Sequence, residues 1–271
     1  NFFYDFFTKY NHEINENNSI QASLYYSDDK FKISSDSLLN YNNRLIGINW
    51  EYKYTKKMSS QLLLNNSDYK YGLDYSNRND KYKSFKSGFH INETNAQIKF
   101  ENKLNNKYTV NYGLSGKLYN VNPGYLNPKE TTSLIVPIDL INEKALEASA
   151  YIKTEAKLTE KLLINIGGRY TLFNYLGANT QRIYQSGLPK NDATLIETKE
   201  YKNNEVIKKY GGFEPRISAR YMLTNSLSTK IGYDKTYQYI HLLSTNTTQT
   251  PTDIWKLSDI NVKPQIGEQF S

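Results

Sequence analysis

The sequence predicts an all-β fold, an antiparallel transmembrane β-barrel, from three observations. Apolar and polar residues alternate with a period of two along most of the chain. The alternating segments are joined in turn by short polar turns, here called pivots, and by long polar connections. Aromatic residues make up 14% of the chain, with 25 Tyr, although the mean hydropathy is only -0.71. A wall that turns one face to lipid and the other to a polar lumen has all three properties.

The alternation predicts five hairpins and therefore ten strands. The clearest hairpin covers 94–115, where Ile98 and Phe100 alternate with Lys99 and Glu101 before a pivot at Asn105-Asn106. The same unit is expected at 6–26, 46–64, 146–172 and 213–233, with pivots at Glu16-Asn17-Asn18, Lys56-Lys57, Thr159-Glu160-Lys161 and Thr224-Asn225. Strands of about 9–11 residues are long enough to cross a membrane when they are tilted.

The connections between the hairpins are expected to be long loops. They cover 27–44, 67–90, 119–144, 175–211 and 241–262, and they are rich in Asn, Ser, Lys, Asp, Gly and Pro. Outer-membrane barrels combine short periplasmic turns with long extracellular loops. We therefore expect all five pivots on one rim and all five long connections on the other.

The two ends of the chain predict that the ten strands do not close on themselves. Asn1 begins inside a strand-like run, and Lys263-Pro264-Gln265 leads into a further strand. Closure would have to pair 1–14 with 227–239, and an unpaired strand edge is very costly in hydrocarbon. We expect 1–271 to be part of one barrel domain whose remaining strands lie outside this chain.

Composition and motifs exclude several classes of protein. The chain has no Cys, which removes disulfides and thiolate chemistry, and no apolar run long enough for a membrane-spanning helix. Its three His residues lie far apart in the sequence, and no catalytic, metal or cofactor motif is present. The net charge of +7 fits a nucleic acid, lipopolysaccharide phosphates, an anionic solute or a compositional bias. Nucleic acid ranks last, because no recognition motif accompanies the charge.

The polar positions of the strands are expected to face the lumen, and the apolar positions to face lipid. Ile98, Phe100, Tyr108, Val110, Ala148, Ile152, Ile217 and Ala219 are predicted to point outward. Lys153, Glu155, Lys157, Arg169, Glu214, Arg216 and Arg220 are predicted to line the lumen, together with Lys99, Glu101 and Asn111. Charged residues there would contact a plug or a passing anionic solute, or they would pair with one another across strands.

Aromatic residues in and beside the long connections are the second set of candidate site residues. They are Tyr119, Tyr125, Phe173, Tyr175 and Tyr184. Such side chains would stack on a sugar, peptide or chelate, or would pack the loops against one another. The sequence does not rank these two interpretations.

Several segments resemble the barrel of TonB-dependent receptors from Bacteroidetes-type bacteria. They are Gly167-Gly168-Arg169-Tyr170, Phe213-Glu214-Pro215-Arg216, 237–243, 251–255 and Lys263-Pro264-Gln265. The resemblance is specific over roughly 160–271. It implies a 22-stranded outer-membrane barrel that holds a plug and takes up a nutrient with energy delivered by TonB, without a cofactor. The partners that the resemblance implies are the plug, TonB and a surface lipoprotein, whereas the apolar faces of the strands themselves predict outer-membrane lipid as a partner.

Two other functions stay open on the sequence. One is a passive outer-membrane channel or structural barrel without a plug. The other is a soluble β-rich binding module, because one buried face would also produce alternation. Charges on the polar face and small Ala residues on the apolar face, such as Ala148 and Ala150, argue against a soluble core.

Overall fold

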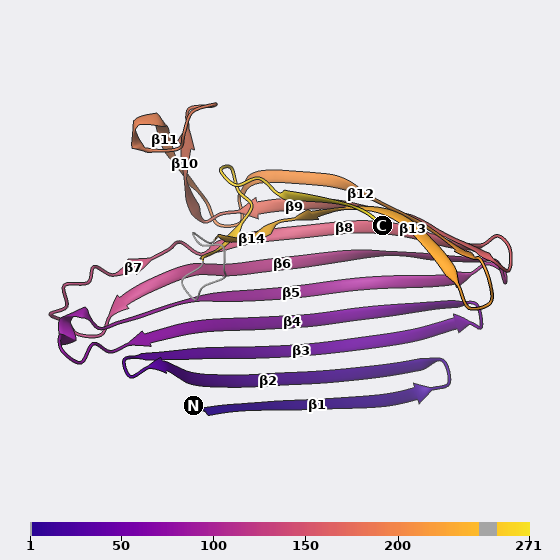
Figure 1. The fold of residues 1–271 in the computed structure, drawn as a ribbon, viewed down its shortest axis with the longest axis horizontal. Coiled ribbons are helices and arrows are strands. Elements are labelled where there is room, and N and C mark those ends of the chain that lie inside the picture. The colour runs from indigo at the N-terminus through magenta and orange to yellow at the C-terminus, as the bar shows by residue number, and fades with distance from the viewer. Residues whose placement is uncertain (1, 244–253) are drawn as a thin grey trace.

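One long curved antiparallel sheet dominates the structure (Figure 1). The computed structural model describes residues 2–243 and 254–271. Asn1 and residues 244–253, which include Pro251-Thr252-Asp253, lie outside the described residues. No helix in the described part of the chain is long and apolar enough to cross a membrane.

The structure contains sixteen strands and two short 3-10 helices in its described part. The first half comprises β1 (Phe2–Asn15), β2 (Asn18–Ser34), β3 (Ser37–Thr55), β4 (Met58–Tyr75), η1 (Lys81–Lys83), β5 (Phe85–Lys103), β6 (Tyr108–Pro128) and β7 (Ile138–Asp139). The second half comprises β8 (Glu143–Lys157), β9 (Leu162–Leu176), β10 (Asn179–Tyr184), η2 (Asp192–Thr194), β11 (Leu195–Tyr201), β12 (Val206–Met222), β13 (Ser228–Gln238), β14 (Ile240–Leu243), β15 (Ile254–Leu257) and β16 (Gln265–Phe270).

The main sheet is an open meander. Its strands follow the order β1-β2-β3-β4-β5-β6-β8-β9-β12-β13-β16, and the short β7 pairs with the end of β6. The ten predicted strands are β1 to β6, β8, β9, β12 and β13, and the further strand expected after Lys263 is β16. Within the described residues β1 pairs only with β2 and β16 only with β13, so the first and tenth predicted strands do not meet. The prediction that the ten strands do not close on themselves is confirmed.

The five short turns lie on one rim, as predicted, and side-chain oxygens hold most of them in place. Thr55, Asn105, Thr159 and Thr224 each accept hydrogen bonds from two backbone N–H groups, two and three residues further along the chain, at 2.8–3.3 Å. Asn and Thr side chains act in this way in Asx- and ST-turns. These four hairpins therefore set their register locally.

The opposite rim differs from the prediction, because the strands extend beyond the apolar belt. The expected loop 27–44 does not exist, since β2 and β3 pair up to a turn at 35–36, with one register shift between Lys32 and Ser34. Strands also occupy much of the other four expected loops, of which 241–262 is described only in part. Beyond the belt the outward-facing positions become mostly polar, while Phe31, Leu39 and Tyr41 lie on the inner face. The apolar pattern of the lipid-facing positions therefore stops there, although the backbone pairing continues.

The two faces of the sheet follow the predicted alternation. Ile98, Leu114 and Ala150 lie side by side on one face, and Lys99, Gly113 and Tyr151 lie side by side on the other. The first set belongs to the outer face, where large apolar side chains are exposed. The second set belongs to the inner face, on which the hairpin of β14 and β15 packs. All the predicted lipid-facing residues lie on the outer face.

Adjacent residues of β8 test this assignment of faces. Ile152 is 57% exposed on the outer face, and Lys153 lies on the inner face. Replacing Ile152 by Arg should lower the free energy of unfolding by about 2–4 kcal/mol, because the charge would enter hydrocarbon. Replacing Lys153 by Arg should change it little. Denaturant titrations of the intact protein in lipid vesicles measure both values, and equal stability of the two variants would contradict the assignment.

Candidate functional site

The inner face carries all seven charged residues that were predicted to line a lumen. Cross-strand register places Lys153 beside Arg216 through Gly167, and Arg169 beside Glu214. Lys157 lies beside Arg220 through Leu163, and Glu155 lies between Lys153 and Lys157 on the same face. Their role stays a prediction.

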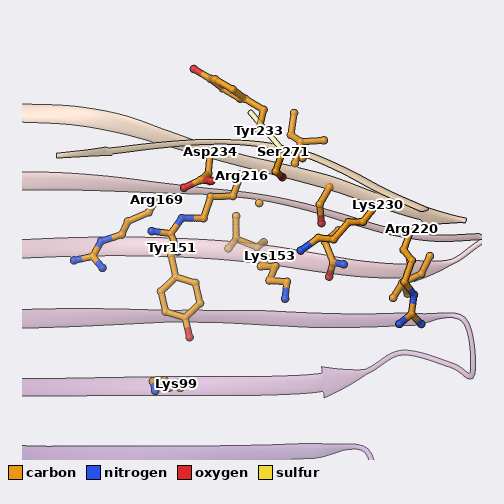
Figure 2. A pocket seen from close by; sticks show the side chains of 18 of the residues that line it. Lys99, Tyr151, Lys153, Arg169, Arg216, Arg220, Lys230, Tyr233, Asp234 and Ser271 are labelled. Carbon is orange, nitrogen blue, oxygen red and sulfur yellow. The ribbon is translucent and has the colours of Figure 1, made fainter. Parts of the chain in front are cut away.

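Four of the seven residues line a depression of about 760 Å³ in the inner face near the short-turn rim. They are Lys153, Arg169, Arg216 and Arg220 (Figure 2). Lys99 and Lys230 add two more positive charges, and Asp234 is the acidic side chain among the lining residues. Lys157 lines a second hollow, next to the turns, with Lys107, Lys161 and Arg220. This half of the inner wall is therefore strongly basic.

The depression is only partly neutralised by ion pairs. Arg169 lies 3.1 Å from Glu147, and Arg216 lies 3.8 Å from Glu214. Within the described residues no carboxylate lies within ion-pair distance of Lys153 or Arg220. Cross-strand pairing thus accounts for Arg169 and Arg216 but not for Lys153 and Arg220, to which the described residues give no carboxylate partner.

Tyr151 lines the depression between Lys99 and Arg169, and a glycine makes room for it (Figure 2). A Cβ atom on Gly113 would lie 2.9 Å from the Tyr151 ring and 2.3 Å from the backbone oxygen of Ile98. The ring lies across the β6 backbone at the point where a side chain would otherwise stand. Gly113 therefore fixes the shape of this part of the inner wall.

A chain of hydrogen bonds borders the depression on the side of the long connections. Tyr119 donates to Glu147 at 3.0 Å, and Arg169 donates to Glu147 at 3.1 Å and to Thr171 at 3.2 Å. Thr171 in turn donates to Glu214 at 2.7 Å. Glu147, Thr171 and Glu214 are buried, and each is hydrogen-bonded, as buried polar groups usually are. These contacts hold Arg169 in a fixed position at the border of the basic zone.

Above this border the hairpin of β14 and β15 covers the inner wall. Lys256 on β15 donates to Glu143 at 2.5 Å and lies 2.8 Å from Asp259. Glu143 also accepts a hydrogen bond of 2.7 Å from the backbone N–H of Leu257. Burial alone would lower the pKa of Lys256, but the carboxylates of Glu143 and Asp259 hold this pKa above its usual value. The hairpin is therefore joined to β8 through a partly buried ion pair.

Apolar and aromatic contacts complete the docking of the hairpin. The rings of Phe173 and Tyr239 stack at 4.5 Å with an interplanar angle of 3°. Leu257 is fully buried in the same cluster with Tyr119 and Tyr175. The hairpin consequently covers this part of the inner wall.

The docking residues were not found by sequence reasoning. Glu143, Lys256 and Asp259 come from segments predicted to be exposed loops, and no local pattern marks them as partners. His241 is buried and shares a hydrogen bond of 2.8 Å with Ser258. Burial and the nearby Lys256 lower the pKa of His241. The hairpin is a long-range feature, so nothing in the adjacent sequence could have revealed it.

The five candidate aromatic residues do not form one site. Tyr119, Phe173 and Tyr175 lie on β6 and β9 under the hairpin, and they are not in loops as expected. Tyr125 lies near the end of β6, and Tyr184 lies at the end of β10 with Arg182 over its ring. The strands continue beyond the apolar belt and carry these residues to different places, so a role for them in ligand binding stays a prediction. The first three support packing rather than ligand stacking in this arrangement.

The described residues contain no group of three His, Asp or Glu side chains placed to hold a metal ion. The inner wall has two zones. One is the open basic depression near the short turns, and the other is the surface that the hairpin of β14 and β15 covers.

Comparison with known protein families gives a match over the whole chain. The family model described as TonB dependent receptor-like, beta-barrel matches residues 1–271. No curated protein sequence matches the chain.

Several solved structures share the fold at low sequence identity. The ferric preacinetobactin receptor BauA from Acinetobacter baumannii has 12% identity and a TM-score of 0.63, over 98% of this chain and 43% of the receptor. The ferripyoverdine receptor of Pseudomonas aeruginosa has 13% identity and a TM-score of 0.62, over 88% of this chain and 36% of the receptor. The hemophore receptor HasR from Serratia marcescens has 11% identity and a TM-score of 0.64, over 99% of this chain and 41% of the receptor. The chain therefore spans less than half the length of each of these proteins.

Two glycines of β6 can be used to test whether Gly113 makes room for the Tyr151 ring. Replacing Gly113 by Ala should lower the free energy of unfolding by about 1–3 kcal/mol, because the new methyl group would displace the Tyr151 ring or the β5 backbone. Replacing Gly116 by Ala is the control, since a Cβ atom there meets nothing within 4 Å. That change should be neutral or stabilise by up to about 1 kcal/mol. Denaturant titration of the intact protein measures both, and equal losses would contradict the account.

The ion pair of the hairpin can be tested with an introduced thiol, because the chain has no Cys. Ser258 is 0% exposed, so a Ser258→Cys variant should react slowly with a maleimide. Adding Glu143→Gln should weaken docking by about 2 kcal/mol and speed the reaction roughly thirtyfold, since the charged acceptor of Lys256 is lost. Glu197→Gln on the exposed β11 is the control and should leave the rate unchanged. Slow labelling of the Glu143→Gln variant would show that this ion pair does not hold the hairpin.

Proposed function

Because this chain belongs to the TonB-dependent receptor-like β-barrel family, we propose that it forms one continuous part of the wall of an energised uptake receptor. Proteins of this family are receptors and transporters of the bacterial outer membrane, so the chain is an outer-membrane component. The short turns then face the periplasm and the long connections face the outside. The proposed activity is TonB-dependent import of a nutrient.

The rest of the barrel and its plug would come from the remainder of a longer protein. This proposal is supported by the share of the similar receptors that the chain covers, between 36% and 43% for the three named above. It is also supported by the outer edges of β1 and β16, which have no strand partner in the described part of the chain. An open edge is very costly in hydrocarbon, and further strands would satisfy it.

The observation that carries the proposal is the division of the inner wall into two zones. Near the periplasmic rim, Lys153, Arg216 and Arg220 present positive charge to the lumen. Near the outside, the hairpin of β14 and β15 covers the wall. A lumen with positive charge near the periplasmic rim and a covering hairpin near the outside suits a receptor that opens for a bound solute. A passive channel needs a continuous water-filled path.

The chemical class of the nutrient is proposed from the charge of the wall. Three of the similar structures are named as receptors of ferric preacinetobactin, ferripyoverdine or a hemophore with heme. An anionic metal chelate would be compatible with the basic depression, and it is the first class to test. The named structures come from Acinetobacter, Pseudomonas and Serratia, so the Bacteroidetes-type assignment stays a prediction. The surface lipoprotein also stays a prediction.

Uptake by the full receptor in cells with and without functional TonB tests the proposal. Mass spectrometry of the receptor purified from outer membranes identifies the molecule it carries, and the labelled molecule is then offered to both kinds of cell. We expect accumulation only where TonB is present. Equal accumulation without TonB would favour the passive channel and would overturn the proposal.

A further inference from the structure

The outer face carries a cluster of charged and amide side chains just beyond its apolar belt. We name Arg44, Asp68, Lys70, His90 and Asn92 the outer polar band. Arg44, Asp68 and Asn92 lie in one row across β3, β4 and β5, and Lys70 pairs with His90 in the next row. The band therefore crosses three adjacent strands at one level.

The alternation of side chains shows that the band points outward. Leu39, Tyr71 and Phe89 lie on the other face of the same strands and form a buried cluster against Trp255 of the inner hairpin. Ile46 lies two residues from Arg44 on the outer face, and it is an exposed apolar residue. The band thus begins where the lipid-facing surface ends, on the side of the long connections.

Asp68 contacts the other four residues of the outer polar band. Its carboxylate accepts from Asn92 and contacts His90 at 2.9 Å each, and it lies 3.6 Å from Lys70 and 3.8 Å from Arg44. The Asp68 side chain is only 9% exposed, whereas Arg44 and Lys70 are 48% and 57% exposed. The negative charge is therefore covered, and the surface that remains is basic.

Further donors surround these two cations. Lys30 and Lys86 lie on the same face one or two rows further out, and Asn66 lies one row nearer the belt. Lys30 is paired with Asp28 at 3.2 Å. An Arg fork, a Lys ammonium and amide groups together form a set of donors that recognises phosphate.

We propose that the outer polar band binds the phosphate of a lipid headgroup in the outer leaflet. The level of the band, beside the lipid-facing residues, brings it to the headgroup region of the surrounding membrane. One covered carboxylate cannot neutralise both exposed cations, and exposed ion pairs at such distances contribute little stability by themselves. The proposal depends on the outer-membrane location of the chain and is independent of energised uptake.

The test compares binding of a bisphosphorylated lipid A to the full receptor and to an Arg44→Gln/Lys70→Gln variant. Native mass spectrometry of receptor in detergent micelles counts the bound lipid over a titration. We expect about thirtyfold weaker binding by the variant, roughly fivefold for each cation removed. Lipid A without its phosphates should bind both proteins equally weakly.

A second variant separates local recognition from net charge. Lys56→Gln/Lys57→Gln removes the same charge from a turn on the opposite rim and should leave the affinity for lipid A unchanged. Heat-modified migration in gels confirms that every variant is folded. Equal affinity of the Arg44→Gln/Lys70→Gln variant and the unaltered receptor would overturn the proposal. An equal loss in the Lys56→Gln/Lys57→Gln variant would also overturn it, because the attraction would then be general.

Discussion

The hydrogen bonds of the backbone are the constraint on which this structure depends. In hydrocarbon each unpaired N–H or C=O group costs several kcal/mol, so a chain that crosses as strands must pair every strand with a neighbour. The meander from β1 to β16 meets this requirement at all its internal strands. Continuous pairing also fixes the alternation of side chains, because a pleated strand turns successive residues to opposite faces. Both surfaces of the wall follow from this single requirement.

The two surfaces then differ along the strands as well as across them. On the inner face a basic depression is followed by the hydrogen-bonded row from Tyr119 to Glu214 and then by the docked hairpin. On the outer face an apolar belt is followed by the band around Asp68. The features that bear on function therefore depend on the order of residue types along each strand, whereas the fold requires only that the strands pair. This separation explains how receptors with about 12% identity share one architecture.

Sequence reasoning succeeded where the determinant was local. The period-two pattern and the pivots at Lys56-Lys57 and Asn105-Asn106 were sufficient to place ten strands, their faces and one rim, because turns and alternation depend on neighbouring residues. The length of β2 and β3 beyond the belt was missed, since the apolar positions change there from the outer face to the inner face, as at Leu39 and Tyr41. The ion pair of Glu143 with Lys256 was missed because 113 residues separate its partners. The charged inner face was predicted, but not its division into an open zone and a covered one.

The self-registering turns have a consequence for how such a wall changes over evolutionary time. A single inserted residue within β8 would move Ile152 and every following residue of that strand to the wrong face, because the side-chain period is two. Because the turn held by Thr159 keeps the pairing of β8 with β9, the partners of these residues in β9 would change face with them unless the extra residue is taken up as a β-bulge. An insertion of two residues keeps the faces, and an insertion in a turn or loop of the outer rim leaves the strands unchanged. Relatives of this chain should vary in length mainly outside the membrane, and their membrane-crossing segments should keep the same parity.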